Sequence, residues 1–376
     1  MKQALFSNFV LAVILVICLG ALLVLGRPIL LPIVTAAISA YVILSATRLL
    51  RRLPVLRHFP TVVLRIGVLI AFTVAFLSVA VIIASTIRQI ADVAPRYQAN
   101  LVDLVERLAE RFDFESAAVW QALHDATIGR IDVQSLVLTL LGSFTSIGSG
   151  IFLVVLYTGF LLAERSNFDQ KLTAAFPDSE SAGRLRSVVA DINQRISDYL
   201  AVKTLVNIIL GGVSYVILLG FDVNFALFWA VAIGLMNYIP YLGSLLGVVF
   251  PVLMSLAQFG TLGATLGLGA CLVAAQVLVG SVIDPRMVGR QVNLSPFVIL
   301  VALSVWTAIW GIPGAILAIP LTSMLAIVLS SFDSTRFVAV LMADRVGPAR
   351  RRAGQGGPAD LTGREPASPV LGRSNP

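Results

Sequence analysis

Long apolar segments are the feature that most constrains how this chain can fold. They lie at residues 9–26, 29–47, 61–87, 144–163, 204–220, 223–258, 261–283 and 296–332. A helix needs about 20 apolar residues to cross the hydrocarbon layer of a bilayer. Hydrophobic residues make up 58% of the chain and charged residues 12%, whereas soluble domains average about 45–50% and about 25%. The sequence therefore predicts an all-α, polytopic transmembrane protein.

The distribution of charge predicts the orientation of the chain. Residues 48–58 contain four arginines and no acidic residue, so we expect them in the cytoplasm, where Lys and Arg concentrate. Residues 88–132 carry eight acidic and five basic residues, and we expect them on the extracytoplasmic side of the membrane. Both termini are then cytoplasmic. The arginines at the ends of apolar runs form no basic face, so the expected surroundings are membrane lipids and no nucleic acid.

Differences in hydropathy divide the chain into six predicted parts. These are three transmembrane helices (1–87), an extracytoplasmic amphipathic helical region (88–143), a fourth transmembrane helix (144–163), a cytoplasmic amphipathic helical region (164–203), a C-terminal transmembrane core (204–333) and a disordered cytoplasmic tail (345–376). In both amphipathic regions apolar residues recur at helical spacing. Their apolar stripes are suited to packing on the membrane domain, to the membrane interface, or to subunit contacts, and these alternatives remain open.

The segment 223–258 combines prolines and glycines with an otherwise apolar run. Proline removes a backbone donor and interrupts a helix. In lipid, an interrupted backbone persists only where it is buried in protein or lines a cavity, and paired interrupted segments point to a translocation site. The residues that we assign to a substrate pathway here are Asn237, Tyr238, Pro240, Gly243, Gly247 and Pro251. Taken alone, the two glycines would more often indicate close helix packing.

A second interrupted hairpin is predicted at residues 296–332. Its pathway residues are Gly311, Pro313, Gly314 and Pro320. Trp306 and Trp310 precede the turn, and we expect them at the membrane interface, where tryptophan is enriched. Each half has about 17 residues, at the lower limit for a crossing. Both a full crossing and a re-entrant hairpin are compatible with this length.

Charged residues between the two hairpins form a candidate gate. Asp284, Arg286 and Arg290 directly follow an apolar helix, so they are expected at the cytoplasmic boundary. The alternative is an exposed ion pair, which would contribute little to stability. Asp222, at a predicted helix junction, is a possible ion site.

Three stretches of the C-terminal half resemble the signatures of the autoinducer-2 exporter family in order and in spacing. They are Ile239–Gly243, Asp284–Pro296 and Trp310–Pro320. The resemblance is specific over residues 177–332 and architectural over 1–165. It implies about eight transmembrane helices, a homo-oligomer in the bacterial inner membrane, and efflux of a small-molecule substrate. Members of the family are linked to export of autoinducer-2, and others to sodium/proton antiport.

The scarcity of ionisable groups favours a neutral cargo. Between Lys203 and Asp284 the only carboxylate is Asp222, although coupled transport usually requires ionisable groups within the membrane. We therefore expect export of a small neutral or weakly polar solute. A sodium/proton antiporter and a non-transporting membrane scaffold are the alternatives. The chain contains only two histidines and no HExxH, GxSxG or P-loop pattern, which predicts no enzyme, no metal and no cofactor.

Overall fold

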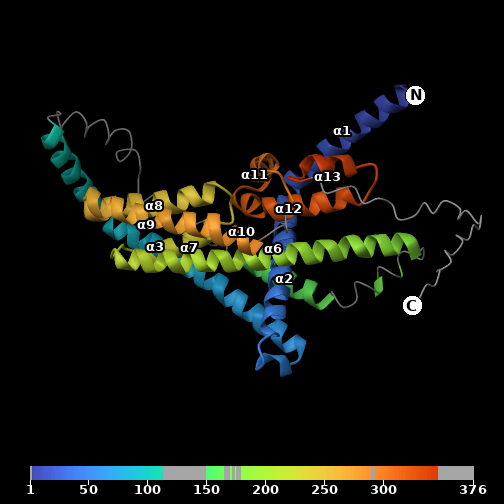
Figure 1. Ribbon diagram of the computed structural model, residues 1–376, viewed down its shortest axis with the longest axis horizontal. Helices are drawn as coiled ribbons and strands as arrows, with labels where there is room; N and C mark the ends of the chain where they lie inside the picture. Colours follow the sequence, from blue (N-terminus) through green and yellow to red (C-terminus); the bar gives the residue numbers. More distant parts are fainter. Residues whose placement is uncertain are drawn as a thin grey trace, which may run out of the picture. The chain divides into compact units, whose positions relative to one another are not determined.

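The computed structural model describes residues 2–112, 150–164, 170–171, 174, 179–288 and 293–345. Every regular element in this part of the chain is helical, which confirms the predicted all-α, polytopic fold (Figure 1). The elements are α1 (Lys2–Leu25), α2 (Arg27–Leu50), η1 (Leu56–His58), α3 (Thr61–Phe112), a helix at Gly150–Glu164, α6 (Ser179–Gly220), α7 (Ala226–Met236), α8 (Leu242–Phe259), α9 (Leu262–Leu278), η3 (Val279–Ile283), α10 (Asp284–Val288), α11 (Pro296–Trp310), α12 (Ile312–Ser330) and α13 (Arg336–Met342). The predicted disordered tail lies outside the described residues, apart from Arg345. Residues 113–143 of the predicted extracytoplasmic region and most of residues 164–178 of the predicted cytoplasmic region also lie outside them.

The two longest helices each join a predicted transmembrane segment to a predicted amphipathic segment. α3 has 52 residues and α6 has 42. The boundaries expected at 87/88 and 203/204 both fall inside these helices. The physical reason is that a drop in hydropathy marks where a helix leaves lipid, and helical hydrogen bonding can continue beyond that point.

Six helical segments among the described residues are long and apolar enough to cross a membrane. They are Arg27–Leu50, Thr61–Ile90, Leu185–Gly220, Leu242–Phe259, Leu262–Met287 and Ile312–Ser330. Four apolar helices are shorter, and α7 has only 11 residues. At 1.5 Å per residue α7 is about 17 Å long, which is less than the hydrocarbon thickness of about 30 Å. The total of about eight crossings stays a prediction.

Helix α6 contacts most of the C-terminal helices, including α7, α9, α10 and α12, as well as α2. Its approach to α7 depends on glycine. A methyl group at Gly211 would lie 3.1 Å from the carbonyl oxygen of Ala230, and one at Gly234 would lie 3.0 Å from that of Asn207. Small residues at these positions bring the two backbones together, as is common between membrane helices.

Both amphipathic stripes pack on the membrane core where they are described. On α3, Tyr97 and Leu104 are buried, and the Asn100 side-chain amide donates to the carbonyl oxygens of Ala257 and Gln258 at 3.1 and 2.7 Å. On α6, Ile196 and its neighbours lie in a cluster with residues of α2, α11 and α12. The packing interpretation therefore holds for these described segments.

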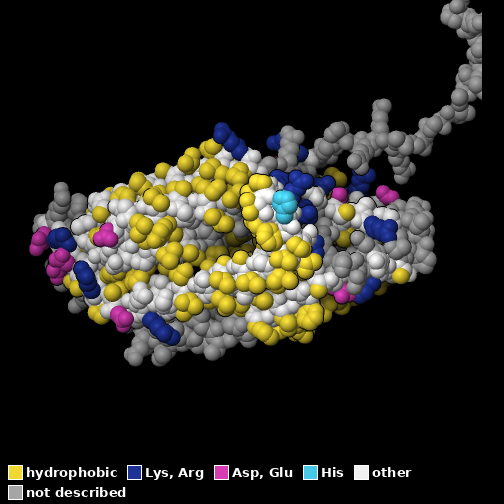
Figure 2. Space-filling view, turned by 90° about the horizontal axis from the view of Figure 1, so that it is seen from below, with side chains coloured by type: hydrophobic (Ala, Val, Ile, Leu, Met, Phe, Trp, Pro, Cys, Tyr) yellow, Lys and Arg dark blue, Asp and Glu magenta, His cyan; other side chains and the backbone are white. Residues whose placement is uncertain are grey.

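Exposed apolar surface is extensive on α3. None of the most apolar window within Thr61–Ile90 is buried in the protein. On the face shown in Figure 2, hydrophobic side chains are spread over much of the described surface. Such continuous apolar exposure is costly in water and expected in a bilayer.

Candidate functional site

A cleft of about 960 Å³ opens between α6, the α7–α8 turn and the helices that follow. It is mostly apolar, with a few polar groups, which is the usual composition of a small-molecule site. The residues that line it are Tyr199, Lys203, Asn237, Pro240, Tyr241, Ser244, Leu245, Val248, Val249, Val273, Gln276, Val277, Gly280, Asp284, Pro285, Ile299 and Ile319. Among the pathway residues predicted from the sequence, Asn237 and Pro240 lie here.

The break between α7 and α8 forms one wall of the cleft. Helix α7 ends at Met236, and the chain turns through Pro240 and Tyr241, whose φ is +62°. Gly243 follows immediately, and a Cβ atom there would lie 1.8 Å from the carbonyl oxygen of Met236. Only glycine fits this turn. The interruption that the prolines and glycines predict is therefore present, and Gly243 makes it possible.

The other predicted residues of this hairpin have structural surroundings of their own. Gly247 faces α7 and α9, where a methyl group would lie 3.6 Å from Ile233 and 3.4 Å from the Gln276 side-chain nitrogen. Pro251 is fully buried in α8. Tyr238 lines a separate, apolar cavity of about 370 Å³ between α6 and α7. Their assignment to the pathway stays a prediction.

A buried ion pair crosses the cleft wall. The Lys203 Nζ donates to Asp284 Oδ2 at 2.8 Å, and the two side chains are only 11% and 25% exposed. The second carboxylate oxygen of Asp284, Oδ1, is buried and has no hydrogen-bond partner among the described residues. A buried carboxylate with an unused acceptor is costly to maintain, so this oxygen is suited to receive a solute donor, a proton or a cation.

The sequence pattern missed Lys203, because it lies at the boundary between a polar and an apolar segment. The structure places it within α6, four residues after the buried Tyr199. A lysine that begins a long apolar run was the available signal, since intramembrane charges are usually functional. Arg286, the partner expected for Asp284, is exposed, and Arg290 lies outside the described residues.

Neutral polar groups complete the cleft. The Gln276 side-chain nitrogen is buried and has no hydrogen-bond partner among the described residues. Ser244 lines the same cleft from α8. The Asn237 amide donates to Asn207 Oδ1 at 2.8 Å and ties the α7–α8 turn to α6. The cleft thus offers an uncommitted hydrogen-bond donor on Gln276 and an uncommitted acceptor on Asp284.

A π-helical turn precedes Asp284. Helix α9 changes to η3 at Val279, and Asp284 then begins α10. Gly280 within this turn lines the cleft. Single π-helical turns inside α-helices occur frequently at functional sites, because they shift the register of the residues that follow. Here the π-helical turn sets the orientation of Asp284, the residue that directly follows it.

The second hairpin contributes Ile299 and Ile319 to the cleft. Its predicted pathway residues lie elsewhere among the described residues: Gly311 forms the turn with φ +68°, and Gly314 and Pro320 are buried between helices. Pro313 stands in the first turn of α12, where proline is well tolerated. Their assignment to the pathway stays a prediction, whereas their contribution to hairpin packing is evident.

Trp310 is packed inside the protein, and its expected level at the membrane interface stays a prediction. Trp310 is 1% exposed, and its indole nitrogen donates to the Leu23 carbonyl oxygen of α1 at 3.0 Å. Trp306 donates to the Thr322 hydroxyl at 3.1 Å. Both indoles therefore find their hydrogen-bond partner inside the protein, which satisfies the same requirement as a membrane interface.

Asp222 lies in the turn between α6 and α7, and it is not among the cleft residues. Its φ is +54°, a conformation that aspartate tolerates better than most residues. Gln258 donates to its carbonyl oxygen at 2.7 Å and accepts from the Asn224 backbone at 2.7 Å. These contacts stabilise the turn, and an ion site at Asp222 stays a prediction.

Comparisons with known proteins agree with this architecture. The sequence profile of the AI-2E family transporters matches residues 11–333, so the likeness includes the N-terminal half. The chain is 29% identical over 265 residues to the "AI-2 transport protein TqsA" of Escherichia coli, which covers 69% of this chain and 74% of that protein. Proteins named "Putative transport protein" are 26% identical over 264 residues in Haemophilus influenzae (69% and 75% covered) and 28% identical over 249 residues in Borreliella burgdorferi (66% and 67% covered).

The helical membrane fold, the interrupted hairpin beside a cleft and the extent of the profile match lead to one conclusion. The chain belongs to the AI-2E transporter family, and it is a membrane transporter.

Proposed function

We propose that the protein exports a small neutral or weakly polar solute, similar to autoinducer-2, through the cleft beside the α7–α8 turn. The solute would cross the membrane by secondary transport or by facilitated export. The observation that carries this proposal is the pairing of an apolar cleft with two uncommitted hydrogen-bonding atoms, Gln276 Nε2 and Asp284 Oδ1. A hydroxylated solute can satisfy both atoms, because a hydroxyl group donates and accepts. The name of the Escherichia coli relative supports autoinducer-2 as a candidate.

We propose that Lys203 and Asp284 form the gate, in place of the expected pair of Asp284 and Arg286. The ion pair connects α6 with the start of α10. Opening it would separate these helices beside the cleft, while solute binding at Asp284 Oδ1 would compensate for part of the lost interaction. The ion pair is suited to such a role because it is largely removed from water.

A sodium/proton antiporter is the second candidate, and the same ion pair favours it. A proton or a sodium ion can neutralise Asp284 and release Lys203. Carboxylates are common groups in proton relays and cation sites within membranes. The Asp284–Lys203 pair supplies the acid–base chemistry that the sequence pattern did not reveal.

Flux in proteoliposomes distinguishes these functions. Vesicles containing the purified protein would be loaded with labelled autoinducer-2, or with other small neutral polyols, and release would be followed with and without imposed proton and sodium gradients. Solute release supports export. Proton flux that depends on sodium, without solute release, supports antiport. The absence of both would contradict the proposal and indicate a scaffold.

A pair of variants tests the gate in the same assay. Asp284→Asn removes the charge from the cleft, and we expect flux to fall at least about tenfold, which corresponds to about 1.4 kcal/mol. Asp103→Asn is the matched control, because it breaks the exposed Asp103–Arg107 pair on α3. Equal flux from Asp284→Asn and the wild-type protein, at equal amounts of folded protein, would contradict the gate.

We further propose that the protein resides in the bacterial inner membrane as a homo-oligomer with both termini in the cytoplasm. The support for this orientation is the arginine-rich stretch 48–58. Labelling an Arg57→Cys variant, in a background without Cys18 and Cys271, with a membrane-impermeant thiol reagent tests it. Labelling only after the cytoplasmic side is exposed supports the orientation, and labelling of intact cells would contradict it.

A further inference from the structure

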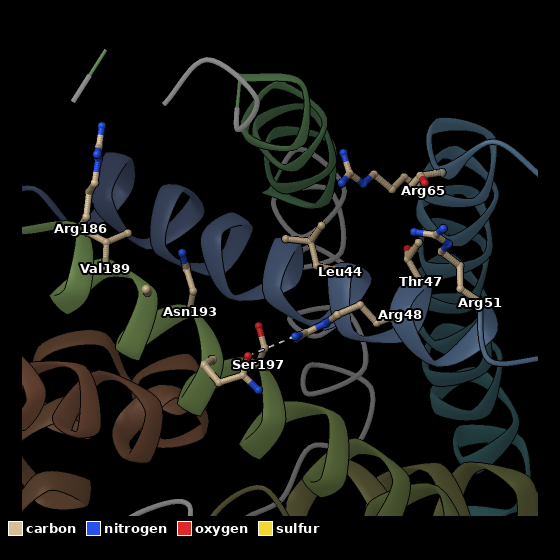
Figure 3. Close-up of a pocket in the computed structure, with 12 residues that line it drawn as sticks. Leu44, Thr47, Arg48, Arg51, Arg65, Arg186, Val189, Asn193 and Ser197 are labelled. Carbon is tan, nitrogen blue, oxygen red and sulfur yellow. Dashed lines mark hydrogen bonds between the residues drawn. The ribbon is translucent and has the colours of Figure 1, made fainter. Parts of the chain in front are cut away.

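A second pocket, apart from the transport cleft, is lined by four arginines. It has a volume of about 440 Å³ and lies between α2, the start of α3 and α6 (Figure 3). The arginines are Arg48, Arg51, Arg65 and Arg186, and the pocket's lining contains no acidic residue. Hydroxyl and amide groups line it as well, from Thr47, Thr61, Asn193, Gln194 and Ser197. The lining is therefore rich in hydrogen-bond donors and positive in charge.

Two of these arginines have no acidic partner among the described residues. Arg51 and Arg65 form no ion pair with any acidic residue in the described part of the chain. The Nε of Arg65 is buried and has no hydrogen-bond partner there. A buried charged donor without a partner is strongly unfavourable. The structure thus contains a guanidinium group that is held in place for an acceptor the described protein does not supply.

Arg48 differs from these two in its contacts. It donates to the Ser45 hydroxyl at 3.0 Å and to the Gln194 side chain at 3.5 Å, and it lies 4.0 Å from Asp198. Its guanidinium is thereby directed to α6, as Figure 3 shows, whereas Arg51 and Arg65 are drawn on the side of the pocket away from Arg186. Arg51 and Arg65 therefore form the part of the pocket to which the described residues supply no counter-charge.

The chemistry of this pair is suited to phosphate. The planar guanidinium presents parallel N–H donors that match two phosphate oxygens, and such pairs are strong when partly removed from water. A carboxylate would also satisfy the charge. A phosphate has more acceptor oxygens, and it can use both arginines together with the hydroxyl group of Thr61.

The pocket's position fits the level of lipid headgroups. It lies where two candidate spans meet, at the end of α2 and the beginning of α3. Beside Arg65, the α3 residues Val62 and Ile66 are 62% and 52% exposed, so an acyl chain could lie along them. Figure 2 shows Lys and Arg side chains gathered beside a histidine on the described surface. Basic pockets between transmembrane helices on the cytoplasmic side commonly bind anionic lipid headgroups.

We propose that this pocket binds a phosphate group through Arg51 and Arg65. The phosphate of an anionic phospholipid and a soluble phosphate share this chemistry, and the experiment below distinguishes them. The proposal concerns a site separate from the transport cleft. It does not depend on the cargo or on the direction of transport.

The test compares two double variants with the same change in net charge. Arg51→Gln/Arg65→Gln removes the uncompensated pair, whereas Arg52→Gln/Arg57→Gln removes two nearby arginines that do not line the pocket. Purified full-length proteins would be titrated in neutral detergent with phosphatidylglycerol, with phosphatidylcholine and with inorganic phosphate. Thermal stability and lipid retention in native mass spectrometry are the readouts.

For the wild-type protein and the control variant we expect stabilisation by phosphatidylglycerol and none by phosphatidylcholine. In Arg51→Gln/Arg65→Gln we expect the affinity to fall about tenfold or more, since charge-assisted hydrogen bonds are lost. Stabilisation by inorganic phosphate alone, also lost in this variant, would assign the site to a soluble phosphate. Equal binding by both double variants, or no binding by the wild-type protein, would overturn the proposal.

A conservative variant covers the case in which the double variant does not fold. Arg65→Lys keeps the charge but removes the planar arrangement of donors, and lysine binds phosphate as a point charge. We expect it to fold and to bind phosphatidylglycerol more weakly than the wild-type protein. Unchanged affinity in Arg65→Lys, together with unchanged affinity in the single variant Arg51→Gln, would exclude a phosphate site at these two arginines.

Discussion

Lys203 and Asp284 are 81 positions apart in the sequence, and the Lys203 ammonium donates to Asp284 Oδ2 at 2.8 Å beside the cleft next to the α7–α8 turn. The pair joins the middle of α6 to the first residue of α10. Each charge is largely removed from water, so each depends on the other for compensation. The contribution of the pair to stability can therefore be measured by substituting each residue alone and both together.

The first prediction concerns the coupling between these two residues. Lys203→Met and Asp284→Asn should each destabilise the protein, because each leaves one charge without its partner. The double variant should lose less than the sum of the two, by about 0.5–3 kcal/mol. Equilibrium unfolding of the purified proteins in detergent measures this coupling. Strict additivity would mean that the pair contributes nothing to stability.

The second prediction separates binding from folding at Gln276. Its buried side-chain nitrogen has no partner in the described protein, so Gln276→Met should leave stability unchanged or raise it by about 1 kcal/mol. Transport should show a KM raised about tenfold, because one hydrogen bond to the solute is lost. Solute flux and thermal unfolding are the measurements.

Gln258 provides the matched control for that change. Its side chain makes two hydrogen bonds of 2.7 Å within the α6–α7 turn. Gln258→Met should therefore destabilise the protein by about 1–3 kcal/mol and leave the KM of the folded fraction unchanged. The reverse pattern, with Gln276 required for stability and Gln258 for KM, would contradict our assignment of the cleft.

The third prediction compares the two glycines of α8. Gly243→Ala would place Cβ 1.8 Å from the Met236 carbonyl oxygen, whereas Gly247→Ala would make contacts of 3.4 Å or more. We expect Gly243→Ala to cost about 1–3 kcal/mol or more through overpacking, and Gly247→Ala to have little effect. Melting temperatures in detergent test this order. Equal losses of stability in the two variants would show that the α7–α8 turn adjusts freely to a side chain at position 243.

The fourth prediction concerns the contact between α3 and the end of α8. Asn100→Ala removes the hydrogen bonds to the Ala257 and Gln258 carbonyl oxygens. We expect a loss of about 1–3 kcal/mol and faster amide hydrogen exchange around residues 256–261. Gln98→Ala, at an exposed position on the same helix, is the control and should change neither quantity.

The sequence predicts the elements of this fold well where local chemistry determines them. The break after Met236 follows from Pro240 and Gly243, because proline and glycine impose their conformations locally. Hydropathy locates the apolar helices but does not locate their ends. Helices α3 and α6 both continue well beyond the residues that suit lipid.

The candidate site is less predictable, because it depends on contacts between distant residues. Asn237 and Asp284 were identified from composition and position, and both line the cleft. The partner of Asp284 was not, because nothing near Asp284 in the sequence indicates Lys203. Trp310 illustrates the same limit: its partner is a carbonyl oxygen of α1, 287 positions away.

The continuity of α3 has a mechanical consequence. One helix carries Arg65 in the arginine pocket and Asn100 at the end of α8, and 35 residues of helix separate them by about 50 Å. A rod of this length transmits a tilt at one end as a larger displacement at the other. Pro95 is the residue within the helix at which bending is easiest. A bend at Pro95 would therefore reduce the part of any movement at Arg65 that reaches Asn100 and the end of α8.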